Sequence, residues 1–265
     1  MSKPLTGIHI LVTRPSHQAG ELAEKIRAAG GEPYLFPVLE IQDISDPRPL
    51  LELIERLDEF YLAIFVSPNA VNKAMNVICA KRALPFDLKI ATVGQGTART
   101  LQRFGVSGVI VPAVRFDSEA LLDMAELNHI HVAGKRIIIF RGDNGRELLG
   151  ETLRKRGAFV EYAECYRRIR PEVEVAPLLA AWARGEMNAV TVTSSEGLRN
   201  LWEMVGDSGR TWLENMPLFV SHERIAGVAR KLGFNRVIVT AAGDDGLVAG
   251  LQDYFSGHIV APTQS

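Results

Sequence analysis

The segment GIHILVTR, from Gly7 to Arg14, returns in outline as GKRIIIFR, from Gly134 to Arg141. Each begins with glycine, continues with an apolar, β-branched run and ends with arginine, and their starts lie 127 positions apart (134 − 7 = 127). Sequence repeats of solenoid proteins have periods of roughly 20–50 residues. A period near half of the 265-residue chain instead predicts a duplicated domain.

Three further segments of the first half align with the second half. The shift stays at 127 until one insertion raises it to 128. The aligned pairs are AIFVSPNAV (63–71) with VTVTSSEGL (190–198), ATVGQGTA (91–98) with LFVSHERI (218–225), and the VIV of 109–111 with the VIV of 237–239. A register kept over four elements is hard to obtain by chance, so we predict that both halves share one fold.

Each half alternates short apolar runs with polar turns and helical patterns. The first helical pattern ends at Gly30-Gly31, a pair that suits a left-handed C-cap, and its copy in the second half ends at Gly157. The apolar positions of the first pattern recur at helical spacing, namely Ala19, Leu22, Ala23, Ile26 and Ala29. Apolar runs without polar alternation are typical of parallel strands covered on both faces. We therefore predict an α/β fold with two similar, doubly wound parallel-sheet domains of about five strands each.

Two segments are longer than one strand requires, PYLFPVLEIQ (33–42) and FVEYAECYRRIRP (159–171). They occupy matching places in the two halves and both read as extended chain. If both cross between domains, the first strand–helix unit of each half lies in the other half's domain. The predicted division is a discontinuous first domain (1–36 and 172–265), a second domain (42–164) and two linker strands (37–41 and 165–171).

The composition is typical of a globular chain, with 47% hydrophobic and 23% charged residues and a net charge of −1. This balance does not point to nucleic acid or to an anionic membrane. No apolar run approaches a transmembrane helix, and the N-terminal segment lacks a signal-peptide pattern, so we expect a cytoplasmic protein. Cys79 and Cys165 are expected to be reduced thiols, and no Cys/His cluster has metal-ligand spacing.

Ligands of doubly wound sheets bind at the carboxyl ends of the strands, where the helices begin. Helix N-termini expose unpaired N–H groups and bind carboxylates or phosphates. Six turns of this kind follow predicted strands: TRPS (13–16), SPN (67–69), GQGT (94–97), RGDN (141–144), TSSE (193–196) and SHER (221–224). Two domains facing each other would surround a cleft with these turns, an arrangement that suits a large polyanion.

Each polar residue of these turns has a structural alternative. The serines and threonines are open to two interpretations, helix N-cap or ligand contact. Arg14 and Arg141 end buried-type strands, where an arginine needs a partner or a ligand, and we favour the ligand. Gly94 and Gly96 are followed by Arg99, so the dinucleotide-binding pattern is not met. Tyr166 lies in a predicted linker, where packing is the usual role of a tyrosine.

Seven motifs, taken together, match one family in order and spacing. They are VTRP (12–15), FVSPNAV (65–71), VGQGTA (93–98), FRGDNGRE (140–147), ECYRRIRP (164–171), VTSSEGL (192–198) and SHERIA (221–226). The chain resembles uroporphyrinogen-III synthases over essentially its whole length. The resemblance implies two flavodoxin-like α/β domains with a swapped internal duplication, joined by a two-stranded linker. It also implies that neither a metal nor an organic cofactor is needed.

The resemblance further implies a reaction and a site. Hydroxymethylbilane, a linear tetrapyrrole with eight carboxylates, would lose water and close with inversion of ring D to uroporphyrinogen III, the precursor of haem, sirohaem and corrinoids. Tyr166 would be the catalytic acid. The remaining site residues would bind the substrate: Arg14, Ser67, Asn69, Gly94, Thr97, Arg141, Gly142, Thr193, Ser194, Ser195 and Ser221.

The sequence also bears on the oligomeric state, the partners and the rival functions of the protein. We expect a monomer that binds neither nucleic acid nor membrane, and transient contact with hydroxymethylbilane synthase (porphobilinogen deaminase), which makes the substrate, stays open. The main alternative is a non-catalytic two-lobed protein that binds a small polycarboxylate. A flavin protein of flavodoxin type is a third interpretation, but it requires one dominant phosphate loop, which the sequence does not offer.

Overall fold

The computed structural model describes residues 3–115, 117–143 and 145–257. The chain divides into two compact units, which are Met1–Glu40 with Ile169–Ser265 (unit 1) and Ile41–Arg168 (unit 2). The chain thus passes from one unit to the other twice. Residues 165–168, which the sequence pattern assigns to a linker, belong to unit 2.

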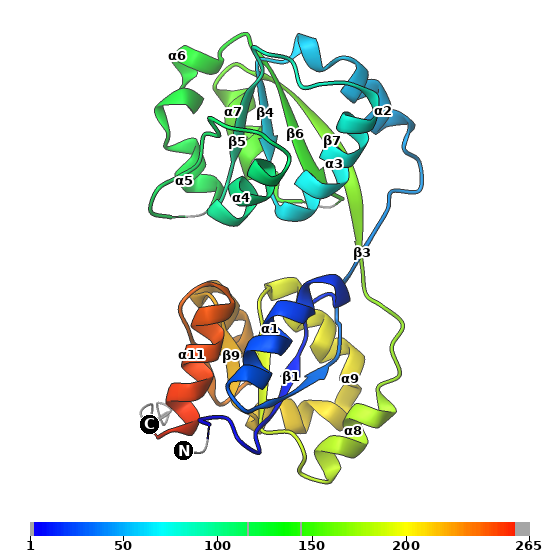
Figure 1. Ribbon diagram of the computed structural model, residues 1–265, viewed down its shortest axis with the longest axis vertical. Coiled ribbons are helices and arrows are strands. Elements are labelled where there is room, and N and C mark those ends of the chain that lie inside the picture. The colour runs from blue at the N-terminus through cyan, green and yellow to red at the C-terminus, as the bar shows by residue number, and fades with distance from the viewer. Residues whose placement is uncertain (1–2, 116, 144, 258–265) are drawn as a thin grey trace. The chain divides into compact units, whose positions relative to one another are not determined.

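Unit 1 is built on a five-stranded sheet with the order β10-β9-β8-β1-β2 (Figure 1). Its elements are β1 (His9–Val12), α1 (Ser16–Ala28), β2 (Glu32–Leu35), α8 (Ala176–Ala183), β8 (Ala189–Val192), α9 (Ser195–Asn215), β9 (Leu218–Val220), α10 (Glu223–Lys231), β10 (Val237–Val239) and α11 (Gly243–Phe255). Strand β1 pairs in parallel with β2 and β8, and β9 pairs in parallel with β8 and β10. The first strand–helix–strand segment of the chain therefore shares a sheet with its last three strands.

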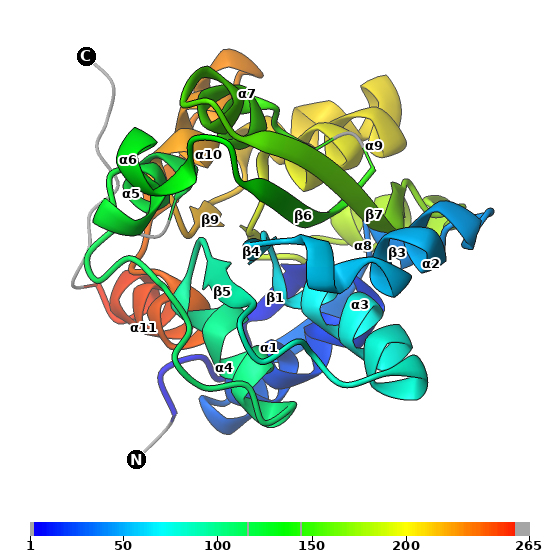
Figure 2. The same ribbon diagram turned by 90° about the horizontal axis from the view of Figure 1, so that it is seen from above.

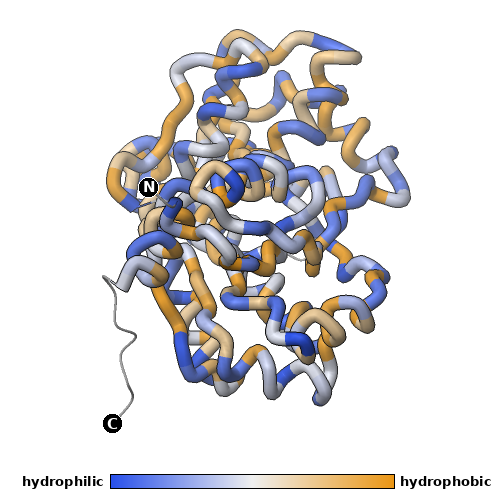
Figure 3. Tube along the Cα trace, turned by 60° about the horizontal axis from the view of Figure 1, so that its bottom comes forward, coloured by the Kyte–Doolittle hydropathy of each residue, from blue (hydrophilic) through white to orange (hydrophobic). Residues whose placement is uncertain are grey.

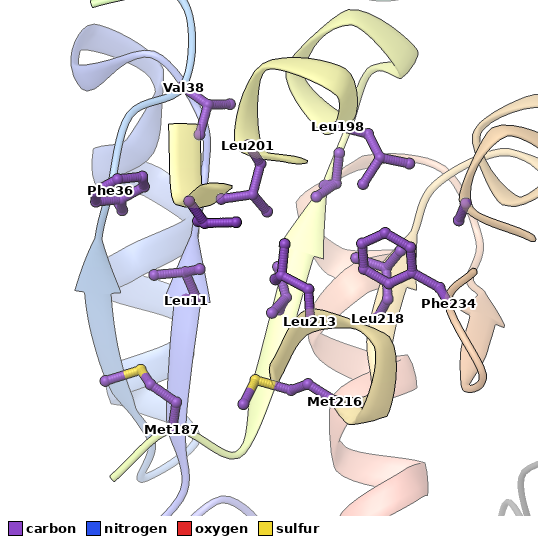
Figure 4. Close-up of a cluster of buried hydrophobic side chains, with 14 of the residues drawn as sticks. Leu11, Phe36, Val38, Met187, Leu198, Leu201, Leu213, Met216, Leu218 and Phe234 are labelled. Carbon is purple, nitrogen blue, oxygen red and sulfur yellow. The ribbon is translucent and has the colours of Figure 1, made fainter. Parts of the chain in front are cut away.

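The core of unit 1 lies on both faces of this sheet. On one face, Leu11 of β1 and Leu218 of β9 pack with Leu198 and Leu201 of α9 (Figure 4). On the other face, α1 and α11 cover the sheet with a separate apolar cluster that includes Leu22 and Leu247. Burial of both faces explains why the strands carry no polar alternation.

Unit 2 has a second five-stranded sheet, with the order β3-β7-β6-β4-β5. Its elements are β3 (Glu40–Gln42), α2 (Arg48–Glu55), η1 (Leu57–Glu59), β4 (Leu62–Phe65), α3 (Pro68–Lys81), β5 (Lys89–Thr92), α4 (Gln95–Arg103), α5 (Ser118–Leu122), η2 (Ala125–Leu127), α6 (His129–Val132), β6 (Arg136–Gly142), α7 (Leu148–Lys155) and β7 (Phe159–Ile169). Strand β4 pairs in parallel with β5 and β6, and β6 pairs in parallel with β7. The prediction of an α/β fold with parallel sheets is therefore confirmed.

One predicted strand is wrong. The VIV of 109–111 forms only an isolated bridge between Ile110 and Ala91, although its counterpart in the repeat, Val237–Val239, is the strand β10. Ile110 bonds to the two residues of β5 that flank Ala91: its N donates to Ile90 O at 2.8 Å, and its O accepts from Thr92 N at 2.9 Å. A pattern of three apolar residues predicts where the chain pairs with the sheet, but not how many residues take part in the pairing.

The glycines of the repeat end helices in the same way. At the end of α1, Gly30 N donates to Arg27 O (2.9 Å) and Gly31 N donates to Ile26 O (2.9 Å), with Gly30 at φ +94°. This pair of bonds is the Schellman motif, in which the left-handed residue favours glycine. Gly157, at φ +82°, ends α7 with the equivalent bond to Arg154 O. The predicted C-cap is confirmed in both copies.

Strand β7 is unusually long and carries an irregularity near its end. It is 11 residues long, and its residues 159–166 lie beside β6 (Figure 2). The register places Arg141 opposite Glu164 but Gly142 opposite Tyr166, so Cys165 is an extra residue. A bulge of this kind re-aims the side chains that follow it.

The helices present one apolar and one polar face. Hydrophobic and hydrophilic residues alternate along the helical parts of the trace (Figure 3). In α1 the buried residues are Ala19, Leu22, Ala23 and Ile26, as the periodicity predicts. Within the described ranges no helix is long and apolar enough to cross a membrane.

Candidate functional site

Tyr166 is the centre of the candidate site in unit 2, and the β7 bulge determines its orientation. Side chains of a regular strand alternate between faces, yet Cys165 is 3% and Tyr166 is 0% exposed. The bulge between them turns the Tyr166 ring into the apolar core of the unit instead of toward solvent. Tyr166 is therefore a buried residue of the strand β7.

The Tyr166 hydroxyl has two hydrogen-bond partners in the described structure. It lies 3.1 Å from Ser67 Oγ, and it accepts a hydrogen bond from Arg168 Nη2 at 3.1 Å. Ser67 is the N-cap of α3, and its Oγ also accepts from Ala70 N at 3.1 Å. Both Ser67 and Arg168 are partly exposed. The buried phenol hydroxyl is therefore bonded to two polar side chains that belong to partly exposed residues.

The loop after β6 holds the end of β7 in place. Asp143 N donates to Tyr166 O at 3.0 Å, and Asp143 Oδ1 accepts from Arg168 N at 2.9 Å. Arg167 Nε lies 3.7 Å from Asp143 Oδ2. Asn144, the last residue of this predicted turn, lies outside the described residues. Asp143 thus fixes the backbone on both sides of Arg167.

Arg141 ends its strand as predicted, but it is paired within its own unit. Its side chain is 8% exposed, Nη1 donates to Glu147 Oε1 at 2.7 Å, and its guanidinium lies 4.2 Å from the centroid of the Tyr162 ring. Glu147 also accepts from the Tyr162 hydroxyl at 2.7 Å. The bonds from Tyr162 and Arg141 hold the pKa of Glu147 below its usual range. The Nε atom of Arg141 is buried and has no hydrogen-bond partner among the described residues.

The other predicted residues of unit 2 lie at the N-termini of α3 and α4. Asn69 is in the first turn of α3 and is partly exposed. Gly94 is the N-cap of α4 and has no side chain to satisfy the helix N–H groups. Thr97 is 3% exposed, so its side chain is not presented to solvent. What this turn offers a ligand is therefore backbone N–H rather than the threonine hydroxyl.

Arg14 of unit 1 matches Arg141 in the repeat and is also paired. Its Nη2 lies 2.5 Å from Asp244 Oδ1, with side-chain exposures of 19% and 10%. Its Nε has no hydrogen-bond partner in the described ranges. Asp244 lies in the first turn of α11, where a carboxylate also interacts favourably with the helix dipole. The sequence does not predict this partner, because no local spacing links the two residues.

The serines of unit 1 differ in role. Ser194 is the N-cap of α9 and accepts from Gly197 N at 2.9 Å. Ser195 Oγ is buried without a hydrogen-bond partner in the described part of the chain, and Thr193 is partly exposed beside it. Ser221 is not a cap, because His222 takes that position and its Nδ1 accepts from Arg224 N. Capping therefore accounts for Ser194 but not for Ser195 or Ser221.

The structure gathers some predicted residues and leaves others apart. Ser67, Gly142 and Tyr166 form one cluster, to which the structure adds Arg168 and Asp143. Gly94 and Thr97 belong to a separate turn of the same unit, and the unit 1 residues form their own group. In the described part of the chain, no group of three or more His, Cys, Asp or Glu residues could hold a metal ion.

Sequence comparison places the chain among known proteins. A family model described as Uroporphyrinogen-III synthase HemD matches residues 20–249. The uroporphyrinogen-III synthase of Escherichia coli (strain K12) is 35% identical over 246 residues, which are 92% of this chain and 99% of that protein. The putative uroporphyrinogen-III synthase of Methanothermobacter thermautotrophicus is 32% identical over 208 residues, 77% of this chain and 80% of that protein.

Solved structures agree on the fold. A mutant uroporphyrinogen III synthase from Thermus thermophilus matches with a TM-score of 0.66 and 17% identity, covering 95% of this chain and 98% of that one. Uroporphyrinogen-III synthetase from Helicobacter pylori matches with a TM-score of 0.54 and 12% identity, covering 95% and 100%. At these identities the likeness concerns the fold alone.

Proposed function

The chain belongs to the uroporphyrinogen-III synthase family, and from that premise we propose how its residues carry out the reaction. The reaction is the cyclisation of hydroxymethylbilane with loss of water and inversion of ring D, in the biosynthesis of tetrapyrroles. Because a carbon–oxygen bond breaks as water leaves, the enzyme is a cyclising hydro-lyase. The rival interpretation, a non-catalytic binder of a small polycarboxylate, is not favoured by the matches.

The substrate's carboxylates are bound mainly by helix N-termini. In unit 2 these are the first turns of α3 and α4, at Ser67 with Asn69 and at Gly94 with Thr97. In unit 1 they are the turns at Thr193, Ser194 and Ser195 and at Ser221. Unpaired N–H groups and the helix dipole bind anions without a net positive charge, which fits a chain with a net charge of −1.

The two arginines of the repeat have a smaller share in binding than their positions in the sequence imply. Arg14 is paired with Asp244, and Arg141 is paired with Glu147. Each keeps one Nε–H without an acceptor among the residues that the structure describes. Both Nε atoms are buried, so a substrate carboxylate would reach them only if neighbouring side chains moved, and a bidentate clamp would also require the existing ion pair to open.

The acid is Tyr166, and one observation carries this assignment. Its hydroxyl lies 3.1 Å from a guanidinium nitrogen of Arg168, so negative charge left on the oxygen after proton transfer has a cation beside it. Loss of hydroxide from the substrate requires a proton, and general acids of this kind contribute about 10²–10⁴-fold to rate. Holding the two ends of a flexible chain together adds an entropic contribution that does not depend on Tyr166.

We also propose that the two units are flavodoxin-like and arose by duplication with exchange of the first strand–helix–strand segment. In unit 1 the strands taken in chain order lie as 2-1-3-4-5, the flavodoxin order. In unit 2 the order is again 2-1-3-4-5 when β6 and β7 are numbered 1 and 2, β4 and β5 are numbered 3 and 4, and the bridge at Ile110 is numbered 5. The sequence repeat matches β1 with β6 and supports the same relationship.

A product assay tests the proposed function. Hydroxymethylbilane is generated in situ with a deaminase, the protein is added, and the oxidised uroporphyrin isomers are separated. We expect mostly isomer III, since the uncatalysed closure gives isomer I. Isomer I alone, at the uncatalysed rate, would leave a binding protein. In the same assay Tyr166→Phe is expected to slow formation of isomer III without abolishing it, and an unchanged rate would exclude the acid role.

A further inference from the structure

Tyr166 is buried, so the route by which its proton reaches the substrate has to be identified. Its side chain is 0% exposed and its ring is part of the apolar core of unit 2. The hydroxyl therefore cannot reach a substrate directly in this structure. A proton that leaves it must pass through one of its two described hydrogen-bond partners, Ser67 or Arg168.

The hydrogen bonds fix the direction of this path. Arg168 has only donors, so the Tyr166 oxygen accepts from it. The phenol hydrogen then has one partner in the described structure, Ser67 Oγ. The opposite polarity, with Ser67 donating to Tyr166, would leave the phenol hydrogen buried and unpaired, which is unfavourable.

The Ser67 hydroxyl keeps its own hydrogen free for an acceptor outside the pair. A hydroxyl oxygen accepts through two lone pairs and donates one hydrogen. Ser67 Oγ accepts from Ala70 N at 3.1 Å and from the Tyr166 hydroxyl at 3.1 Å, so both lone pairs are used. Its own hydrogen remains available to an outside acceptor, and Ser67, unlike Tyr166, is partly exposed.

We propose that Ser67 donates a proton to the leaving hydroxyl of the substrate and that the buried Tyr166 hydroxyl donates a proton to Ser67 in its place. This inference rests on the proposed function and assigns Ser67 a chemical role beyond binding. The carbon–oxygen bond of the substrate breaks with its electron pair on oxygen, which takes the Ser67 proton and leaves as water. Ser67 takes the Tyr166 proton, and the phenolate is held beside the Arg168 guanidinium. Ring closure releases one proton from the substrate, which returns along the same path.

Asp143 and Arg168 are positioning residues in this arrangement. Asp143 Oδ1 accepts from Arg168 N and Asp143 N donates to Tyr166 O, so one side chain and its backbone fix both residues of the pair. The cap bond from Ala70 N fixes Ser67 in the same way from α3. The three groups therefore need no rearrangement to pass a proton, which is what a relay requires.

Substitutions of Ser67 test the relay when they keep its role as the N-cap of α3 but remove its hydroxyl proton. Ser67→Asn keeps an N-cap acceptor but has no hydroxyl proton to pass, and Ser67→Thr keeps both. We expect the rate of isomer III formation to fall about 100-fold in Ser67→Asn and in Tyr166→Phe, and to stay within about threefold in Ser67→Thr. Because the groups act in series, the Ser67→Asn/Tyr166→Phe double variant should be no slower than the slower single variant.

Asp117→Ala is the matched control. Asp117 is the N-cap of α5 in the same unit and accepts from Ala120 N at 2.7 Å, so its loss removes a cap outside the site. We expect it to keep the wild-type rate. Full activity of Ser67→Asn, or a double variant whose losses multiply, would overturn the relay while the proposed function stands. A wild-type protein that forms only isomer I would overturn both.

Discussion

Gly142 and Tyr166 lie opposite each other on β6 and β7, and the absence of a side chain at Gly142 makes room for the Tyr166 ring. A Cβ atom built on Gly142 would lie 2.5 Å from Tyr166 Cε2 and 2.7 Å from Cζ. Contacts below 3.0 Å are not tolerated, so one of the two residues would have to move. The ring is enclosed by the core of unit 2 and cannot swing away without disturbing it.

Gly142→Ala is therefore expected to displace the ring and to separate the Tyr166 hydroxyl from Ser67. Overpacking of this kind costs about 1–3 kcal/mol of stability, and the rate of isomer III formation should fall at least about tenfold. Urea unfolding and the product assay measure the two effects. Gly20→Ala in α1 is the control, because the added Cβ would meet no described atom within 4 Å beyond its own residue, its chain neighbours and the backbone of its own helix. It should stabilise the protein by about 0.5–1 kcal/mol and leave the rate unchanged. Wild-type activity in Gly142→Ala would contradict the packing argument.

The two cysteines should differ sharply in reactivity. Burial raises the pKa of the Cys165 thiol to about 12, whereas Cys79 is exposed. Since the thiolate is the reactive form, a disulfide reagent at about pH 8 should label one thiol of the folded protein and two in denaturant. The Cys79→Ser variant is expected to show no rapid labelling when folded. Rapid labelling of that variant would mean that the end of β7 opens readily.

Much of the fold follows from local pattern. The spacing of Leu22 and Ile26 predicts α1 and its buried face, and the glycines of the repeat predict the left-handed ends of α1 and α7. Both depend on residues close together in the chain, where period and capping rules apply. The bridge at Ile110 shows the limit, because strand length depends on what the neighbouring strand offers.

The candidate site is harder to predict, for two physical reasons. The bulge at Cys165 reverses the direction of Tyr166, and a bulge is a property of two paired strands that one strand's sequence does not reveal. The acids that pair with Arg14 and Arg141 are not evident as partners, because Asp244 and Glu147 stand near helix starts, where acids are common anyway. The sequence thus locates the turns but not the contacts among their side chains.

The Arg14–Asp244 ion pair should contribute measurably to the stability of unit 1. Both side chains are mostly buried, so Asp244→Asn leaves the Arg14 charge without its partner and is expected to cost about 2–3 kcal/mol. In a double-mutant cycle with Arg14→Met, the losses of unfolding free energy should be less than additive by about 1–3 kcal/mol.

Urea unfolding measures the free energy of unfolding of each variant. Asp207→Asn is the control, because Asp207 is 96% exposed in its pair with Arg210 and should matter by less than about 1 kcal/mol. Additive losses would show that the two residues act independently.

Glu147 should make part of the stability of unit 2 depend on pH. Its pKa is lowered in the folded protein, first by the Tyr162 hydroxyl and then by Arg141. A group with a depressed folded pKa stabilises the fold above its unfolded pKa, and that contribution is lost as the pH falls through the folded pKa. Glu147→Gln resembles the protonated side chain and cannot titrate.

The free energy of unfolding should therefore be higher for wild type than for Glu147→Gln near pH 7, and this difference should shrink as the pH falls below the usual glutamate range. Taking the difference between the two proteins removes the contribution of the other acids, which titrate equally in both. Urea unfolding at a series of pH values between about 7 and 3 measures it. A difference that stays constant over this range would show that Glu147 stabilises Arg141 by geometry alone. A difference that grows on acidification would mean that the carboxylate is unfavourable where the structure places it.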